Sequence, residues 1–363
     1  SLVEASDLRR RPLASIRKGL DHMAATGRRS ARDRIGDRRH LVLLLVRYSL
    51  FLALAIWLVV MSLASAHFLT QTNMLNVARQ ASPIIILGIG MTFVMATAGI
   101  DLSVGSLVAL VSVVLVTLFD LGWPTFLVLA SVAMVGLASG LTNGSFVRLG
   151  LPPFVVTLAM LTTLRGIAFV ISDGYATPIH DDFVLWLGRG QIGDVHVPIV
   201  IAIVVAIVGW LVLNTTRYGL YALAVGGRED AARAMGINVG RIKLAVYGGL
   251  GMLGALAGTI FAGRLGNGSP NAGMLVELDV IAAVVLGGTS LFGGVATIAG
   301  TLAGALFINF VRNGLNLLGV NPFWVQVVTG IILLLAVLMN TVVNRRVSQW
   351  ASATPVDELD ETP

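Results

Sequence analysis

Two ionisable side chains stand within apolar stretches of this sequence, where a charge is costly unless another group compensates it. Asp101 lies in the segment Gly99-Ile-Asp-Leu-Ser-Val-Gly105, and Arg165 lies midway along an apolar run at 154–172. The carboxylate either lines a polar pathway at a helix break or caps the N-terminus of the next helix. Arg165 either gates a pathway or locks the structure by binding a carboxylate, such as that of Asp101, or backbone carbonyls.

The sequence lacks the groups that most enzymes and nucleotide-binding proteins need. Its only lysines, Lys18 and Lys243, precede Gly19 and Leu244, so it contains no Gly-x-x-x-x-Gly-Lys-Ser/Thr motif for binding phosphates. It has no cysteine, and its five histidines are scattered without metal-ligand spacing. We expect no enzyme activity, metal or cofactor in this chain, and any ATPase that drives it must be a separate subunit.

Membrane helices must position these residues. Hydrophobic residues make up 56% of the 363 positions and charged residues 12%, against about 25% charged residues in soluble domains. A membrane helix needs about 20 mostly apolar residues, and this length predicts ten spans in an all-α protein. The spans are 41–66, 81–99, 103–119, 124–143, 154–172, 197–213, 244–263, 275–287, 294–312 and 323–342.

The distribution of basic residues predicts the orientation. Twelve of the 25 Lys and Arg residues lie in positions 1–47 and five more in the loop 214–243. The positive-inside rule therefore places both termini in the cytoplasm. We expect a basic, disordered or surface-lying arm at 1–40, a transmembrane domain at 41–343 and a cytoplasmic tail at 344–363. Because the arm precedes an apolar span, it favours membrane lipid over nucleic acid as its partner.

Acidic residues gather at the predicted outer face. Asp181 and Asp182 belong to the acidic loop 173–196, and Glu277 and Asp279 lie at the outer end of the span 275–287. Such charges can dock a soluble protein with a complementary surface, or they are ordinary solvated groups at the membrane interface.

Glycines indicate both close packing and breaks. Three small-residue pairs four positions apart favour close helix contact: Gly136 with Gly140, Gly254 with Gly258, and Gly300 with Gly304. The segments 99–105 and 287–294 are glycine-rich, and we expect them to be breaks, with Thr289 or Ser290 capping the helix after the second.

The cytoplasmic loop 214–243 contains a short predicted helix at 229–235 that ends at Gly236. Glu229 and Arg233 stand four positions apart and can pair on this helix. Because Ala231 and Ala232 are small, the helix either fits a groove on a partner protein or is a solvated loop helix.

Here the sequence resembles a known family. The segment Glu229-Asp-Ala-Ala-Arg-Ala-Met-Gly-Ile237 resembles the coupling loop of ATP-binding-cassette (ABC) importer permeases. The segments 90–105, 150–158 with Arg165-Gly166, and 275–294 resemble signature segments in permeases of the ribose/xylose/galactose class, in the same order. The resemblance covers residues 75–340 and implies two related, inverted halves with broken helices.

The resemblance also implies the function and the partners. The chain would be a permease subunit in the bacterial inner membrane, forming the pathway for a small neutral solute that we expect to be a monosaccharide. ATPase subunits would bind ATP and Mg²⁺, a periplasmic or lipoprotein binding protein would deliver the solute, and a second copy or a sister permease would complete the pathway. The alternative is an ion-coupled secondary transporter, which would need several intramembrane carboxylates or histidines, whereas only Asp101 and Asp279 qualify.

The resemblance and the residue chemistry together give the candidate site residues. The coupling loop comprises Gly226, Glu229, Ala231, Ala232, Arg233, Gly236 and Ile237. A neutral sugar needs hydroxyl and amide groups, and the candidates for the pathway or its gate are Thr97, Asp101, Ser103, Phe154, Thr157, Arg165, Asn309 and Asn313.

Overall fold

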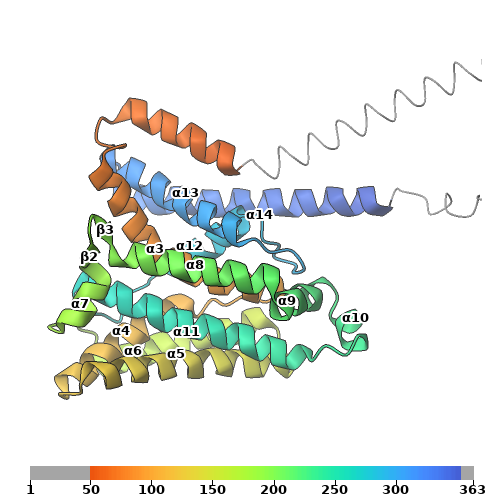
Figure 1. The fold of residues 1–363 in the computed structure, drawn as a ribbon, viewed down its shortest axis with the longest axis horizontal. Coiled ribbons are helices and arrows are strands. Elements are labelled where there is room, and N and C mark those ends of the chain that lie inside the picture. The colour runs from red at the N-terminus through yellow and green to blue at the C-terminus, as the bar shows by residue number, and fades with distance from the viewer. Residues whose placement is uncertain (1–49, 353–363) are drawn as a thin grey trace, which may run out of the picture. The chain divides into compact units, whose positions relative to one another are not determined.

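Figure 1 shows the fold of the computed structural model, which describes residues 50–352, with side chains through residue 338 and at Thr341. The predicted basic arm at 1–40, the start of the first predicted span at 41–49 and the tail from 353 lie outside the described residues.

The described chain is mostly helical. Its helices are Leu50–Ala64, α3 Gln71–Ala96, α4 Val104–Asp120, α5 Thr125–Arg148, α6 Pro153–Ser172, α7 Asp182–Arg189, α8 Val197–Thr215, α9 Arg217–Gly227, α10 Glu229–Ala234, α11 Val239–Leu265, α12 Val276–Leu286, α13 Ile298–Leu317 and α14 Pro322–Ser352. Two short antiparallel pairs complete the fold: β1 Thr177–Pro178 with β4 Asn267–Gly268, and β2 Gln191–Ile192 with β3 Val195–His196.

Six of the described helices are long and apolar enough to cross a membrane, namely α3, α5, α6, α8, α11 and α13. The stretches Leu50–Ala64, Val104–Asp120 and Pro322–Leu338 are shorter apolar helices. Each predicted span falls on one of the described helices, so the helical membrane architecture is confirmed. The predicted number of ten crossings is not established by these lengths.

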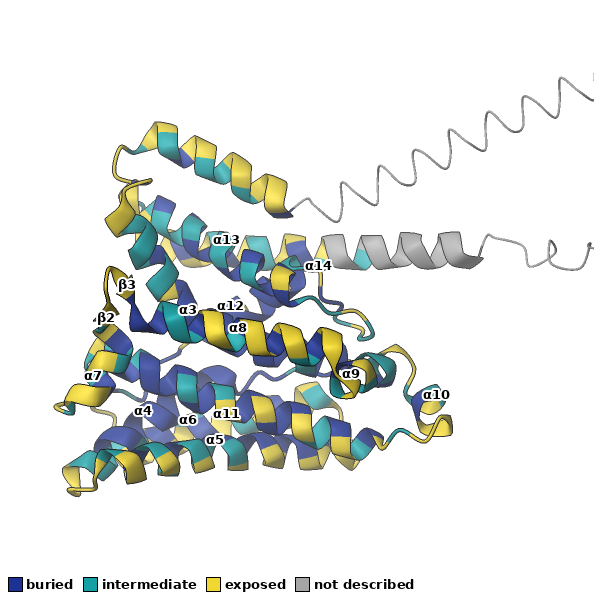
Figure 2. Ribbon diagram, viewed as in Figure 1, coloured by how far each residue is buried: buried dark blue, intermediate teal, exposed yellow. Residues whose placement is uncertain are grey.

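The long helices differ in how much of their surface the protein itself covers. α3 is buried along most of its length, whereas α5, α6 and α8 leave large apolar side chains such as Phe126, Val170 and Ile207 exposed (Figure 2). Extensive exposed apolar surface marks contact with lipid or with another protein. We therefore take α3 as a central helix and α5, α6 and α8 as peripheral ones.

Glycines allow close contacts between neighbouring helices. Gly136 and Gly140 of α5 face Gly251 and Tyr247 of α11, and a side chain at either α5 position would overlap a backbone carbonyl there. Gly254 and Gly258 lie close to the Leu107 and Val111 side chains of α4. Gly300 and Gly304 lie against the carbonyls of Gly287, just after α12, and Ala283 of α12. The packing predicted from the small-residue spacing is therefore confirmed.

Both glycine-rich segments interrupt the helical structure. The first break separates α3 from α4 and contains Ala98 in a left-handed conformation, with φ 59°. The second break separates α12 from α13 and contains Gly293 and Gly294 at φ 83° and 76°. The residue that caps α13 is Thr297, whose side chain accepts the N–H of Gly300, and not Thr289 or Ser290 as the sequence suggested. The Thr289 hydroxyl instead accepts the N–H of Thr297 at 3.2 Å.

Candidate functional site

The first helix break contains a buried carboxylate. Asp101 is 3% exposed, and its Oδ1 accepts the backbone N–H of Ser103 at 2.8 Å and the Ser103 hydroxyl at 2.6 Å. Its Oδ2 accepts the side-chain amide of Asn143 from α5 at 3.0 Å. The N-cap of α4 is Ser103, so Asp101 does not cap the helix as one of the two sequence interpretations proposed. It instead binds the N–H and hydroxyl of the N-cap residue and so holds the turn that leads into α4.

Three neighbouring helices hold this break in place. The carbonyl of Ile100 accepts the Tyr247 hydroxyl from α11 at 3.2 Å and, more weakly, the Thr157 hydroxyl from α6 at 3.4 Å. Asn143 supplies the contact from α5, and its Oδ1 has no hydrogen-bond partner among the described residues. Backbone that leaves the helical pattern inside a membrane protein needs such partners from its neighbours. The structure therefore brings Asp101, Ser103 and Thr157 together.

Arg165 binds backbone carbonyls. Its Nη1 donates to the carbonyls of Pro270 and Ala272, both at 2.7 Å, in the segment that precedes α12. The guanidinium also interacts electrostatically with Glu277. Of the partners considered from sequence, backbone carbonyls are confirmed and Asp101 is not the partner. Arg165 thus ties α6 to the chain before α12.

The remaining pathway candidates lie apart from the first break or face their own helices. Thr97 is buried and donates to the carbonyl of Val94, and Asn309 is buried and donates to the carbonyl of Ala305. Phe154 is exposed on the first turn of α6. Asn313 exchanges two amide hydrogen bonds with Asn73, at 2.9 and 2.8 Å, and so joins α13 to α3.

The loop between α8 and α11 forms two short helices, α9 and α10, separated by the extended residue Arg228. Glu229 opens α10 and pairs with Arg233 at 2.7 Å, as predicted, and also with Lys243 of α11 at 2.8 Å. These hydrogen bonds, led by that from Lys243, hold the pKa of Glu229 below its ordinary value of 4.5. Gly236, at φ 80°, follows α10 as the predicted C-terminal glycine.

The surface of α10 differs from the prediction in one respect. Ala232 is buried against the chain itself and Ala231 is half-buried, so these small residues do not form an open face. Asp230, Arg233 and Met235 are exposed, and Ile237 is half-buried behind them. An exposed methionine beside charges of both signs forms a surface that a partner protein can cover.

The acidic loop lies at the end of the bundle opposite α10, where α7 and the β2–β3 hairpin are drawn (Figure 1). Asp181 caps α7 by accepting the N–H of Val184 at 2.9 Å, and it also accepts the Thr125 hydroxyl at 2.6 Å. Asp182 is exposed in the first turn of α7. Of these two aspartates, Asp182 is the one whose charge is presented outward.

Glu277 and Asp279 are buried in α12. Asp279 forms a bidentate ion pair with Arg312 of α13, with Nη1 at 2.6 Å from Oδ2. Glu277 lies against Gly105 of α4, and its Oε2 has no hydrogen-bond partner among the described residues. The sequence placed both residues on an outer docking face, but side chains that are 8% and 3% exposed offer little surface to a soluble partner.

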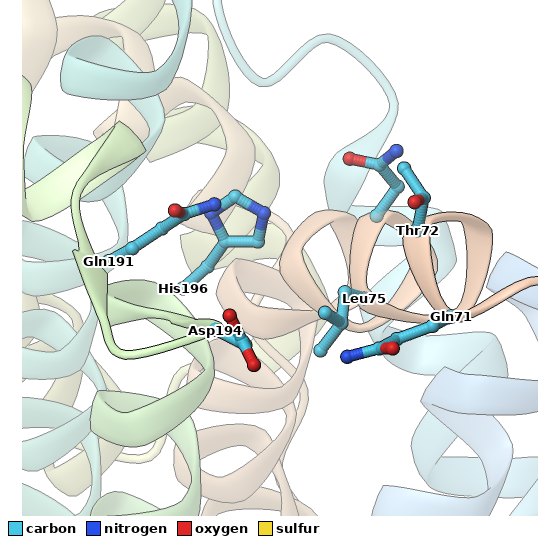
Figure 3. Close-up of a pocket in the computed structure, with 7 residues that line it drawn as sticks. Gln71, Thr72, Leu75, Gln191, Asp194 and His196 are labelled. Carbon is cyan, nitrogen blue, oxygen red and sulfur yellow. The ribbon is translucent and has the colours of Figure 1, made fainter.

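A polar pocket of about 370 Å³ lies at the same end as the acidic loop (Figure 3). Its lining combines the first turns of α3 with the β2–β3 hairpin: Gln71, Thr72, Leu75, Asn76, Gln191, Asp194 and His196. His196 is 9% exposed, and its Nδ1 has no hydrogen-bond partner among the described residues. Amide, hydroxyl, carboxylate and imidazole groups together suit a ligand rich in hydroxyl groups.

Sequence reasoning missed this pocket and the role of Tyr247. The pocket residues come from two segments far apart in the chain, and none of them lies in an apolar stretch where a polar residue would be conspicuous. Tyr247 was overlooked because an aromatic residue in an apolar helix usually belongs to the packing.

Comparison with known proteins gives a family. The family model described as "Branched-chain amino acid transport system / permease component" matches residues 73–337. The ribose import permease protein of Haemophilus influenzae is 41% identical over 299 residues, which cover 81% of this chain and 93% of that protein. No solved structure matches the chain.

Two further relatives come from Escherichia coli K12. A probable ABC transporter permease protein is 40% identical over 302 residues, covering 83% of this chain and 91% of that protein. The xylose transport system permease protein is 34% identical over 342 residues, covering 77% and 87%. Together with the family model and the helical membrane architecture, these matches show that the chain belongs to the family of ABC importer permeases that includes the ribose and xylose import permeases.

Proposed function

We propose that this chain forms the transmembrane pathway for a monosaccharide in an ABC importer. The observation that carries the proposal is the 41% identity to a ribose import permease along 93% of that protein's length. The description of the family model names branched-chain amino acid transport. The two relatives cited above whose names give a solute are, however, permeases for ribose and xylose. The polar pocket in Figure 3 supports a hydroxyl-rich solute.

The two ends of the bundle would meet different partners. The exposed surface of α10 would dock an ATPase subunit, which binds ATP and Mg²⁺. The opposite end would receive the solute-binding protein, with Asp182 presented on α7 and the polar pocket making the first contact with the released sugar. A second permease chain, identical or related, would cover exposed apolar surface and complete the pathway.

Within this proposal the chain crosses the inner membrane of a bacterium ten times, so both termini lie on the same side. The basic residues place that side in the cytoplasm. The two helix breaks would belong to two inverted halves of the permease. The basic arm at 1–40 would lie on anionic lipid. Rocking of the helices between nucleotide-bound and nucleotide-free states would expose the pathway to each side in turn.

Uptake in the native host tests the solute and the energy source. Deleting the gene should abolish uptake of ¹⁴C-ribose or ¹⁴C-xylose, and a plasmid copy should restore it, while ¹⁴C-leucine uptake stays unchanged. Loss of leucine uptake alone would contradict the sugar proposal. Uptake that collapses with the proton gradient while cellular ATP is maintained would instead support the ion-coupled secondary transporter.

The docking proposal has a separate test. The double variant Glu229→Arg with Gly236→Trp should prevent co-purification of the ATPase subunit, because it replaces the charge that anchors α10 and obstructs the turn after it. The control is Arg217→Gln, which changes an exposed charge of the same loop outside α10, without a described ion pair. Normal ATPase association and uptake in the double variant would show that the ATPase docks elsewhere.

A further inference from the structure

Three backbone segments that are distant in sequence meet at one point in the structure. They are the last turn of α9 around Gly226, the first break after Ala96, and Gly293-Gly294 in the second break. The N–H of Gly294 donates to the carbonyl of Ala96 at 3.1 Å, so one break supplies a hydrogen bond to the helix end at the other. Ala96 is the last residue of α3, where backbone carbonyls have lost their helical partners.

Gly226 lies directly against both breaks. A methyl group at Gly226 would overlap the Ala96 carbonyl oxygen and would come within 2.8 Å of the Gly294 nitrogen. In the other direction, a methyl group at Gly293 would lie 2.6 Å from the Gly226 carbonyl oxygen and 2.8 Å from the Ala98 nitrogen. The three segments therefore touch through their backbones, which can transmit a displacement without a flexible side chain between them.

The next glycine in the chain is in a different environment. A methyl group at Gly227 would have its nearest neighbour, the Gly294 Cα, at 3.9 Å, which is an ordinary van der Waals contact. Neither Gly226 nor Gly227 has a positive φ, so the backbone conformation itself does not require glycine at either position. The close contact alone distinguishes the two, and they form a matched pair for mutation.

α9 connects this contact point to the cytoplasmic loop. Only Arg228 separates the end of α9 from α10, so a movement of α10 acts directly on the last turn of α9. At the other end of α9, the rings of Tyr218 and Phe93 pack with their centroids 6.3 Å apart, which holds α9 to α3. Because α9 is held to α3 near its start, a displacement of its end by α10 would rotate α9 against the two breaks.

We propose that Gly226 is a coupling residue, through which the backbone of α9 transmits movement of α10 to both helix breaks at once. This proposal rests on the proposed docking of the ATPase at α10. The breaks are the places where α3–α4 and α12–α13 can change direction, since they lack continuous helical hydrogen bonds. A single contact with both breaks moves the two parts of the bundle together.

The first experiment compares Gly226→Ala with Gly227→Ala in the complete importer. Gly226→Ala should reduce uptake of ¹⁴C-ribose or ¹⁴C-xylose, whichever the wild type carries, by roughly tenfold, within the 5–150-fold range that coupling energies span. It should still co-purify with the ATPase subunit, since α10 is unchanged. Gly227→Ala should retain both uptake and co-purification. Uptake by Gly226→Ala at the wild-type rate and membrane level would overturn the proposal.

A second measurement tests the coupling of nucleotide binding to the first helix break, even if Gly226→Ala folds poorly or the solute is misassigned. The chain has no cysteine, and Ala98 is exposed within the first break, so Ala98→Cys introduces a single reporter. Its maleimide labelling rate should change several-fold when the assembled importer binds Mg-ATP with vanadate. Adding Gly226→Ala should abolish that change in the assembled importer, whereas adding Gly227→Ala should leave it intact. If the labelling rate of Ala98→Cys in the otherwise wild-type importer does not change with nucleotide, the coupling proposal is overturned. If that rate does change with nucleotide but neither sugar is taken up, only the proposed solute is contradicted.

Discussion

Asn143 donates its side-chain amide to Asp101 at 3.0 Å and also lies 2.9 Å from the Ser103 hydroxyl, so one residue of α5 binds both polar residues of the first helix break. In the described part of the chain, Asp101 forms no salt bridge. Its charge is therefore balanced by hydrogen-bond donors alone. A buried carboxylate without a cation depends strongly on each of those donors.

Replacing Asn143 with alanine should destabilise the permease. The Asp101 carboxylate would keep only its bonds from Ser103, and losing a donor to a buried charged group costs about 1–3 kcal/mol. Thermal unfolding in detergent measures the effect. The control is Thr142→Ala, where an exposed hydroxyl bonds only to the carbonyl of Ala138 in its own helix. Equal melting temperatures for the two variants would contradict the importance of the Asn143 contact.

The ion pair between Asp279 and Arg312 should behave as a coupled pair. Arg312→Leu leaves the buried Asp279 carboxylate without its partner and should cost about 3–5 kcal/mol, the usual range for breaking a buried pair. Asp279→Leu with Arg312→Leu should recover much of that loss, since no isolated charge remains. A double-mutant cycle on thermal unfolding provides the measurement, and simple additivity of the two single effects would contradict the coupling.

Local sequence patterns predicted the elements of this fold well. Long apolar runs located the helices, glycine-rich segments located both breaks, and the four-residue spacing of Glu229 and Arg233 gave their ion pair. These features depend on neighbours within a turn or two of helix. The glycine pairs also predicted close contacts, because a missing side chain constrains packing whichever helix lies opposite.

Long-range partners could not be predicted in the same way. The sequence placed Asp279 at an outer surface, but the cation that allows its burial lies 33 residues later, on a different helix. Arg165 was expected to bind a carboxylate or backbone carbonyls, but the sequence could not show that its partners are carbonyls more than 100 residues away. The meeting of Gly226 with both breaks has no local signature at all, because three separate backbone segments create it.

Pocket variants should lower the maximal rate of uptake. In a binding-protein-dependent importer the solute concentration giving half-maximal uptake is set largely by the binding protein, whereas the permease must capture the released solute. Gln191→Ala with Asn76→Ala removes two hydrogen-bonding groups worth about 1 kcal/mol each, so a fall of up to about thirtyfold in maximal ¹⁴C-ribose or ¹⁴C-xylose uptake is expected, with half-saturation unchanged. Tyr175→Ala, in the same outer loop and outside the pocket, is the control. Full activity of the pocket variant would exclude the pocket from solute transfer.

The order of α10 should depend on pH through Glu229. Hydrogen bonds from Lys243 and Arg233 lower the pKa of Glu229 in the folded chain, so its contribution to stability is fully present above its ordinary value of 4.5 and is lost as pH falls through the lowered pKa. A nitroxide at Ala234→Cys, an exposed position on α10, reports the mobility of the helix by electron paramagnetic resonance. The label should stay ordered from neutral pH down to about 4.5 and become mobile below it. In Glu229→Gln the uncharged amide cannot form the ion pairs, so the label should be more mobile at neutral pH and the acid transition should be weaker. The same acid transition in both proteins would show that another group controls it.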